Sequence, residues 1–292
     1  MRDKIFFSFS VEGKIRMKKQ RLWPNWKINA QKWNNHLKRT IFDIWLFEEL
    51  ESEKQKEANF IVMETVKQIP YGMSNFEDVI MQNRYYVDKT MYIPLLEDQA
   101  NYLIFIRPRR FGKSLLLSML RSYYDLSQKD KFQQLFGNLW IGQHTTPLQG
   151  KYQILYLDFS KIGGSIDELP QRFDSYSAVQ LDGFLNRYRE YYTDEFIERF
   201  SAADKGIDKL HILDDEARRL GYPLYLIIDE YDNFTNVVLN EKGNEIYRAI
   251  THASGFYRDA FKNYKGMFDR IFMIGVSPVT LDDLSSGYNI GW

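Results

Sequence analysis

The chain has 292 residues, and its 39 Lys and Arg balance 39 Asp and Glu, so its formal net charge is zero. That length suffices for one large or two modest domains, and the charge balance gives no overall basic excess to argue for nucleic acid. The sequence has no Cys, which excludes disulfides and thiolate metal sites, and its four scattered His do not suggest a zinc site. No apolar run approaches the roughly 18 residues of a membrane-spanning helix, so we expect a cytoplasmic protein.

Residues 1–62 differ in composition from the rest of the chain. A basic run at 17–21 lies near four of the six Trp residues. Basic and aromatic residues alternate in this way at nucleic-acid and membrane surfaces, so nucleic-acid binding through residues 14–39 is a side hypothesis. The simpler interpretation is a poorly ordered N-terminal extension, since chain ends usually carry disorder. Within it, residues 40–56 predict a helix.

Two short helices are expected ahead of the first strong motif. Ser74, followed three residues later by Glu77, predicts a capping box at the start of the first helix. Asp88 or Thr90 would cap the second helix, over residues 91–99.

Tyr85 and Tyr86 lie between these two helices, just ahead of a phosphate-loop motif. Nucleotidases often place base contacts in this part of the chain, so stacking of either ring on adenine is one interpretation. Packing of each ring in the core is the alternative, because buried aromatic rings contribute mainly through the apolar area they cover.

A strand, a loop and a helix follow one another over residues 102–124. The apolar run 103–106 predicts a buried strand, and the loop 107–112 leads into Lys113, Ser114 and a Leu-rich helix. This is the phosphate-binding arrangement of P-loop nucleotidases.

The residue types in the loop suit a nucleotide phosphate. Gly112 lets the backbone approach without a Cβ, Lys113 can reach the β- and γ-phosphates, and the hydroxyl of Ser114 can ligate Mg²⁺. The unpaired N–H groups that open the helix favour an anion. The first Gly of the usual pattern is replaced by Arg107, so the motif depends on its context. The predicted nucleotide-binding set is Arg107, Pro108, Arg109, Arg110, Phe111, Gly112, Lys113, Ser114 and Leu115.

A second motif is the apolar run 224–228, which ends in Asp229 and Glu230. Such a run predicts a strand buried on both faces, and paired acids at its end are costly to desolvate without a function. In a Walker B motif, Asp229 would hold Mg²⁺ and Glu230 would polarise the attacking water. The alternative is a strand that simply enters an acidic loop, which Asp232 would continue.

Two more apolar runs complete the strand pattern. Residues 152–159 predict a strand ending at Asp158, and residues 269–278 predict the last strand, with Ser277 at its end. Ligands collect at the carboxyl ends of parallel strands, so Ser277 is a catalytic candidate that would sense the γ-phosphate or orient water. Its alternative role is a hydroxyl that caps its own turn. Asp158 is likewise either a site carboxylate or a hydrogen-bonded structural residue.

The remaining polar stretches favour helices. Residues 131–141 and 240–265 carry apolar side chains at helical spacing, and residues 171–220 predict a helical insert over about 165–222.

Strands joined by helical crossovers predict an α/β fold of the P-loop NTPase type, with a parallel sheet in three layers. In sequence, the strand ending at Asp158 separates the loop strand from the acidic strand. With a glutamate after the Walker B aspartate, this order is typical of nucleotidases that have an extra strand beside the loop strand and use a catalytic Glu.

Several motifs together resemble the bacterial AAA-ATPase-like family. They are IPYGMSNFEDVIMQNRYYVDKTMYIPLLE, YLIFIRPRRFGKSLLLSML, LYLIIDEYDNF and FMIGVSPVTLDDLSSGYNI, in this order over residues 69–290. The resemblance implies ATP and Mg²⁺ as ligands, and it makes Arg107 the family's own form of the loop. It assigns Lys113 and Ser114 to Walker A, Asp229 and Glu230 to Walker B, and Ser277 to a sensor-like position.

Residues 1–62 lie outside this family pattern, so the AAA-ATPase-like domain is expected over 63–292. The sequence ends at Trp292, directly after the last motif. We therefore expect the C-terminal lid, and the PD-(D/E)XK nuclease-like domain often fused to the family, to be absent. No D-x(n)-ExK set follows the sheet, so nuclease activity is not predicted.

Three functions remain open at this stage. The first is Mg²⁺-dependent ATP hydrolysis, coupled to an unknown protein partner or nuclease. Arg109 or Arg110 would then stabilise transition-state charge, or act on a neighbouring subunit of a homo-oligomer. The second is a nucleotide-gated regulatory module with little turnover, in which the insert moves. The third is an inactive fragment.

Overall fold

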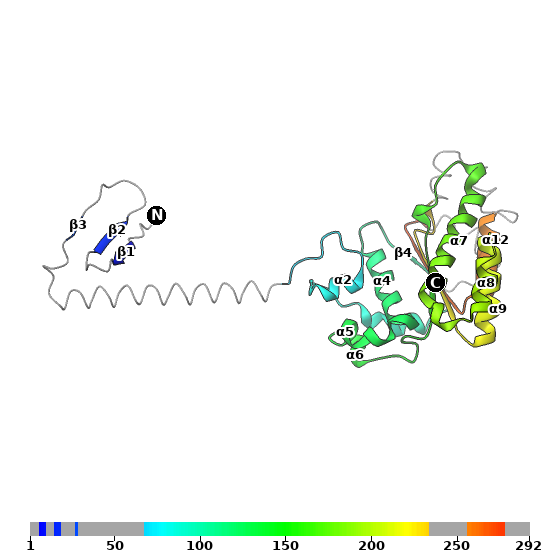
Figure 1. Cartoon of the computed structure of the whole chain (residues 1–292), viewed down its shortest axis with the longest axis horizontal. Coiled ribbons are helices and arrows are strands. Elements are labelled where there is room, and N and C mark those ends of the chain that lie inside the picture. Colours follow the sequence, from blue (N-terminus) through cyan, green and yellow to red (C-terminus); the bar gives the residue numbers. More distant parts are fainter. Residues whose placement is uncertain (1–5, 10–14, 19–26, 29–66, 234–255, 278–292) are drawn as a thin grey trace. The chain divides into compact units, whose positions relative to one another are not determined.

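The computed structural model describes residues 6–9, 15–18, 27–28, 67–233 and 256–277 (Figure 1). Contacts divide the chain into two units, Met1–Lys67 and Gln68–Trp292. In the first unit, three strands pair antiparallel in the order β1 (Phe6–Phe9), β2 (Ile15–Lys18) and β3 (Lys27–Ile28). Sequence analysis predicted no strands here. The helix expected at 40–56 and the four Trp of this region lie outside the described residues.

The second unit is built on a four-stranded sheet in which every neighbouring pair is parallel. Its strands are β4 (Tyr102–Ile106), β5 (Gln153–Asp158), β6 (Leu224–Asp229) and β7 (Arg270–Gly275). They lie in the order β4-β7-β6-β5. The four apolar runs in the sequence therefore predicted the strands correctly, to within one residue at each end except for the last strand, which ends at Gly275 and not at 278.

The strand order brings together segments that are far apart in sequence. β7, the last strand, lies between β4 and β6, with Ile106 beside Gly275 and Asp229 beside Ile274. An extra strand therefore does lie beside the loop strand, and it is β7, whereas β5 lies on the far side of β6. The ends of β4 and β6 consequently face the same edge of the sheet, one strand apart.

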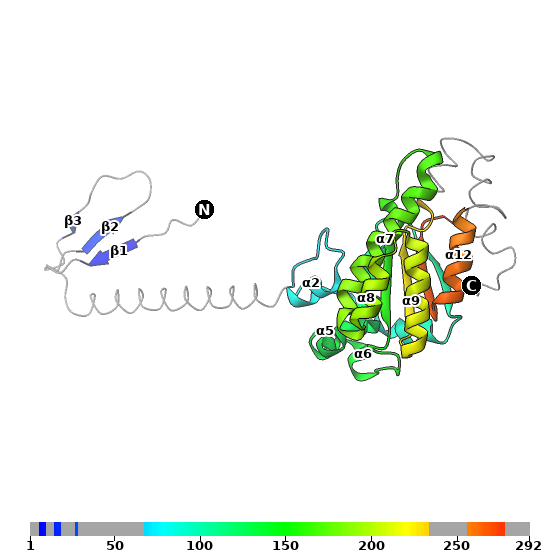
Figure 2. The ribbon, with the colours of Figure 1, turned by 45° about the vertical axis from the view of Figure 1, so that its right-hand side comes forward.

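Helices cover both faces of this sheet, as the three-layer prediction required (Figure 2). One face carries α7 (Leu169–Tyr188), α8 (Asp194–Ser201), α9 (Gly206–Leu220) and α12 (Phe256–Met267). The other carries α4 (Lys113–Tyr124), with α2 (Phe76–Met81), α3 (Ile93–Glu97), α5 (Phe132–Phe136) and α6 (Trp140–Gln143). Short 3-10 turns are η2 (Thr90–Tyr92), η3 (Leu126–Lys131), η4 (Phe159–Lys161), η5 (Ile166–Glu168) and η6 (Arg189–Tyr191).

Successive side chains of β6 point to opposite faces of the sheet and so belong to two different cores. Leu226 and Ile228 join the core beneath α7, α9 and α12, whereas Tyr225 and Ile227 join the core beneath α4. All six residues of β6 are buried. This continuous burial is the reason that the strand is apolar at every position up to the acid at its end.

The region expected to be a separate helical insert supplies three of the four helices, α7, α8 and α9, that cover one face of the sheet. α7 packs on both β5 and α9, and its buried side chains belong to the same core as the strands. At Gly206 the two helices come so close that an added Cβ would lie 2.7 Å from the carbonyl oxygen of Asp174. The polar, charged composition that suggested an insert belongs to the outward faces of these helices.

Two local predictions differ from the structure. The N-cap of α2 is Asn75, not Ser74, and its Oδ1 accepts hydrogen bonds from the backbone N–H groups of Glu77 and Asp78. Asn is as good an N-cap as Ser, and the sequence pattern did not separate two adjacent candidates.

The second helix, expected at 91–99, is shorter and divided between η2 and α3. Asp88 stabilises the start of η2, because Oδ1 of Asp88 accepts hydrogen bonds from both the backbone N–H and the hydroxyl of Thr90. Residues 131–141 form two helices, α5 and α6, instead of one, with Gly137 after the first. The first part of the helix expected at 240–265 lies outside the described residues.

Gly275 tests how tightly the ends of β6 and β7 pack. A Cβ there would lie 2.5 Å from both Oδ1 of Asp232 and Cε1 of Tyr231. We expect Gly275→Ala to lower the free energy of unfolding by about 1–3 kcal/mol, measured by denaturant unfolding. Gly183 is the matched control, since it is exposed within α7 and has nothing within 4 Å of a Cβ. Gly183→Ala should stabilise by about 0.5–1 kcal/mol; equal effects of the two changes would contradict this packing.

Candidate functional site

The loop between β4 and α4 presents an uncapped helix end at the carboxyl edge of the sheet. α4 begins at Lys113, and its N-cap is Gly112, which adopts the left-handed conformation with φ 73°. No side chain caps this helix end. The N–H groups of its first turn are therefore available to an anion, which the helix dipole also favours.

The rest of the loop is open to solvent. Residues 107–112 are all exposed, including the ring of Phe111 at 66%. The backbone N–H of Arg107 donates to the carbonyl oxygen of Gly275 at 3.0 Å, which attaches the start of the loop to β7. The loop is thus held at both ends and free between them, as a ligand-binding loop must be.

Ser114 and Asp229, the two expected metal ligands, are in direct contact. The hydroxyl of Ser114 donates to Oδ2 of Asp229 at 2.9 Å. Adjacent ligands of an octahedral Mg²⁺, with bonds of about 2.1 Å, lie about 3 Å apart. Mg²⁺ in phosphate sites usually takes one or two protein oxygens and completes its shell with phosphate and water. The two oxygens therefore fit the ion.

Lys113 and Glu230 form the second contact across the same edge. Nζ of Lys113 lies 3.3 Å from Oε1 of Glu230, with the Lys side chain 6% exposed and the Glu side chain 26%. A buried ammonium without a counter-charge is strongly unfavourable, so Glu230 stabilises Lys113 in this state. Any ligand that takes Lys113 must replace this carboxylate.

Backbone strain is concentrated at these same residues. Among the described residues, the non-glycine positions with positive φ are Asn83, Arg110 at 67° and Glu230 at 51°. A left-handed conformation costs a side-chain-bearing residue about 1–2 kcal/mol. Strain of this kind clusters at ligand-binding sites, and here two of the three positions belong to the predicted site. At Glu230 the N–H donates to Oδ1 of Asp229 at 2.9 Å, which supports the conformation.

A protein-family model described as Predicted AAA-ATPase matches residues 70–285. The matched span contains the loop, the acidic end of β6 and β7. The chain belongs to this AAA-ATPase-like family. Membership suggests nucleotide binding, in agreement with the geometry of the loop. Comparison with curated proteins found no match.

Tyr156 is a further residue beside Asp229, and the sequence pattern did not single it out. It projects from β5, and its hydroxyl donates to Oδ2 of Asp229 at 3.3 Å. The guanidinium of Arg121, on α4, lies over the Tyr156 ring at 4.3 Å from its centroid. Burial, reinforced by Asp229 and Asp158, raises the pKa of Tyr156 well above its usual value, so it remains a hydrogen-bond donor at neutral pH. Its position two residues before Asp158 puts the two side chains on the same face of β5, but the sequence does not show that β6 and Asp229 lie beside it.

Burial also raises the pKa of Asp229. The hydrogen bond from Ser114 opposes this shift, and the neighbouring charges of Glu230 and Asp158 add to it. The site thus holds a carboxylate that is costly to ionise. A bound cation would supply the missing counter-charge.

Ser277 lies at the same edge, just past the end of β7. Its N–H donates to Oδ2 of Asp232 at 2.6 Å, and its carbonyl oxygen accepts from the hydroxyl of Tyr231 at 2.7 Å. Asp232 also accepts from the N–H of Val276 at 3.1 Å and is only 1% exposed. Asp232 is therefore buried and attaches the backbone after β7 to the end of β6, an arrangement that we call the Asp232 clamp. It is not the continuation of an acidic loop.

The other candidates from the sequence have local structural roles. Oδ1 of Asp158 accepts from the N–H and hydroxyl of Ser160, at 3.0 and 2.6 Å, so the structural interpretation of Asp158 holds. The Tyr86 ring packs edge-to-face on Phe76 at 5.2 Å, which places it in the core. Tyr85 is 56% exposed, and adenine stacking at this position stays a prediction.

None of the helices in the described ranges is long and apolar enough to cross a membrane.

Asp229→Asn tests whether burial makes the ionised carboxylate of Asp229 unfavourable in the folded protein. Because the pKa of Asp229 is raised in the folded state, wild-type stability relative to the variant falls as pH rises from the unfolded value through the raised folded one. We expect Asp229→Asn to have the higher Tm without nucleotide or Mg²⁺. The gap should widen as pH rises above the pKa of Asp229 in the unfolded chain and level off once the folded carboxyl group is ionised, measured by thermal unfolding over a series of pH values. The exposed Asp215→Asn is the control and should show no such trend. A gap that narrows with pH would contradict the interpretation.

Proposed function

We propose that this chain binds ATP with Mg²⁺ at the edge formed by the β4–α4 loop and the end of β6, and hydrolyses it to ADP and phosphate. The observation that carries the proposal is a double contact: Ser114 with Asp229, and Lys113 with Glu230. Each loop residue meets the strand-end acid with which it would cooperate around a nucleotide. The base identity, ATP over GTP, comes from the family.

In this proposal the loop residues bind the triphosphate. The free N–H groups at the start of α4 would face the phosphates, and Gly112 leaves room for them. Lys113 would exchange the carboxylate of Glu230 for the β- and γ-phosphate oxygens. Arg109 and Arg110 are exposed in the same loop and are the candidates for neutralising charge that develops on the γ-phosphate, in this chain or in a neighbouring subunit.

Ser114 and Asp229 would hold Mg²⁺. When bound, the ion withdraws charge from the phosphate oxygens and so lowers the barrier to their displacement. Tyr156 would keep its hydrogen bond to Asp229 after Ser114 turns toward the ion.

Glu230 would act as the base. Once Lys113 binds the phosphates, the carboxylate of Glu230 is free to accept a proton from water. The oxygen of that water attacks the γ-phosphorus, the bond from this phosphorus to the bridging oxygen breaks, and ADP leaves with the electron pair. The proton on Glu230 then passes to solvent. Ser277, whose backbone is held just past the end of β7, would orient water or contact the γ-phosphate.

Variants of the two paired residues test the assignment. We expect Lys113→Ala to abolish measurable ATP binding in calorimetric titration with Mg²⁺, because the phosphates lose their only buried cation in the loop. Glu230→Gln should keep binding and lose turnover by at least about 100-fold, since a general base contributes on the order of 100- to 10,000-fold. An active Glu230→Gln enzyme would overturn the role of Glu230.

The contact between Lys113 and Glu230 makes a further prediction. Glu230→Gln removes the charge that competes with phosphate for Lys113, so nucleotide affinity should rise about fivefold, equivalent to about 1 kcal/mol. The gain should appear for ADP as well as ATP, which separates release of Lys113 from relief of repulsion at the γ-phosphate. Unchanged ADP affinity, measured by the same titration, would show that the ion pair does not compete with the nucleotide.

A further inference from the structure

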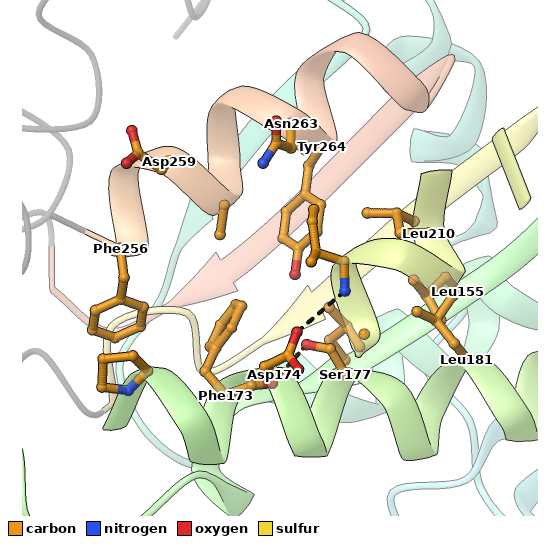
Figure 3. A pocket seen from close by; sticks show the side chains of 15 residues that line it. Leu155, Phe173, Asp174, Ser177, Leu181, Leu210, Phe256, Asp259, Asn263 and Tyr264 are labelled. Atoms are coloured by element: carbon orange, nitrogen blue, oxygen red, sulfur yellow. Dashed lines mark hydrogen bonds between the residues drawn. The ribbon is translucent and has the colours of Figure 1, made fainter. Parts of the chain in front are cut away.

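A cavity of about 290 Å³ lies on the face of the sheet opposite α4. It is lined by α7, α9, α12 and β5, is open to solvent on one side, and is seen from close by in Figure 3. Its walls are mostly apolar, formed by Leu155, Leu157, Phe173, Leu181, Leu210 and Phe256. The volume is near the lower end of the range for small-molecule pockets, about 300–1000 Å³.

A few polar groups converge on this apolar space. Oδ1 of Asp174 accepts from the backbone N–H of Ile207, at the start of α9, at 3.2 Å. The hydroxyl of Ser177 donates a hydrogen bond to the carbonyl oxygen of Phe173 at 2.8 Å. In Figure 3, the ring of Tyr264 extends from α12 toward α7, where Asp174 and Ser177 lie. Asn263 adds an amide from α12.

The charge of the cavity has one sign. Among the described residues that line it there is no Lys, Arg or His, and two are acidic, Asp174 and Asp259. Asp259, at the exposed N-terminal turn of α12, is paired with Lys262 at 3.3 Å. Within the described part of the chain, Asp174 has no ion pair, and its one hydrogen bond leaves acceptor positions on the carboxylate. The carboxylate of Asp174 would repel an anionic occupant and would pair with a cation.

We propose that this cavity is a binding site for a small apolar molecule that carries one protonated amine. The apolar walls would take the hydrocarbon or aromatic part, and the ammonium would donate to Asp174. The cavity volume limits the ligand to about one ring with a short arm. Because α4 and the cavity are on opposite faces of the sheet, the ligand would not compete with a nucleotide at the loop. The proposal is therefore independent of the proposed ATPase function.

Phenethylamine is a suitable probe, because it has one aromatic ring and an ammonium on a two-carbon arm. Titrated into the full chain and followed by ligand-observed NMR and calorimetry, it should bind with a Kd below about 1 mM, within the limits for so small a ligand. Phenylacetate, with the same ring and the opposite charge, should not bind. Saturating ATP should leave the phenethylamine affinity unchanged. Binding of both probes with equal affinity, or of neither, would overturn the proposal.

Two variants locate the site. Asp174→Asn removes the negative charge but keeps a side-chain oxygen that can accept the hydrogen bond from the backbone N–H of Ile207 at the start of α9. The fold should therefore be unchanged, and the affinity for phenethylamine should fall by at least tenfold. The exposed Asp215→Asn on α9 is the matched control and should bind as wild type does. Ala260, which lines the cavity, gives a second variant, since Ala260→Phe fills the space and should abolish binding. Wild-type affinity in Asp174→Asn, or in Ala260→Phe with an unchanged Tm, would place any bound amine elsewhere and refute the proposed site.

Discussion

The contact between the opening turn of α4 and the acidic end of β6 is the interaction on which the rest of the domain depends. It joins a lysine and a serine on a helix to two carboxylates on a strand, across the strand that separates β4 from β6. Desolvating such charges is costly unless they are paired. The strand order, the left-handed Gly112 and the strained backbone of Glu230 all serve to bring these four side chains together.

The far end of α4 holds that turn in place. Tyr123 and Tyr124 are fully or almost fully buried, and Tyr124 packs on Tyr225 of β6 with ring centroids 5.4 Å apart. The N–H of Tyr152 donates to the carbonyl oxygen of Tyr124 at 2.9 Å, which ties the helix end to the chain leading into β5. A rigid helix anchored on the sheet at one end positions Lys113 at the other. The aromatic content of the chain thus contributes to the accuracy of the site as well as to the core.

Apolar runs predicted all four parallel strands because a strand buried on both faces must be apolar throughout. The β4–α4 loop and the acidic residues Asp229 and Glu230 at the end of β6 could also be located from the sequence, since each motif consists of adjacent residues. Tyr156 and Asp232 were not, because their partners lie on other strands and only the strand order brings them together. Adjacent N-cap candidates such as Ser74 and Asn75 differ too little in intrinsic preference for sequence to choose between them.

The Asp232 clamp has a mechanical consequence. It takes the backbone N–H groups of Val276 and Ser277, while the neighbouring Tyr231 holds the carbonyl of Ser277. Gly275 leaves no free space beneath this arrangement. The ends of β6 and β7 are therefore fastened into a single stiff unit that begins next to Glu230. A displacement of Glu230, if Lys113 changes partner, would therefore act on both strand ends together and not on β6 alone.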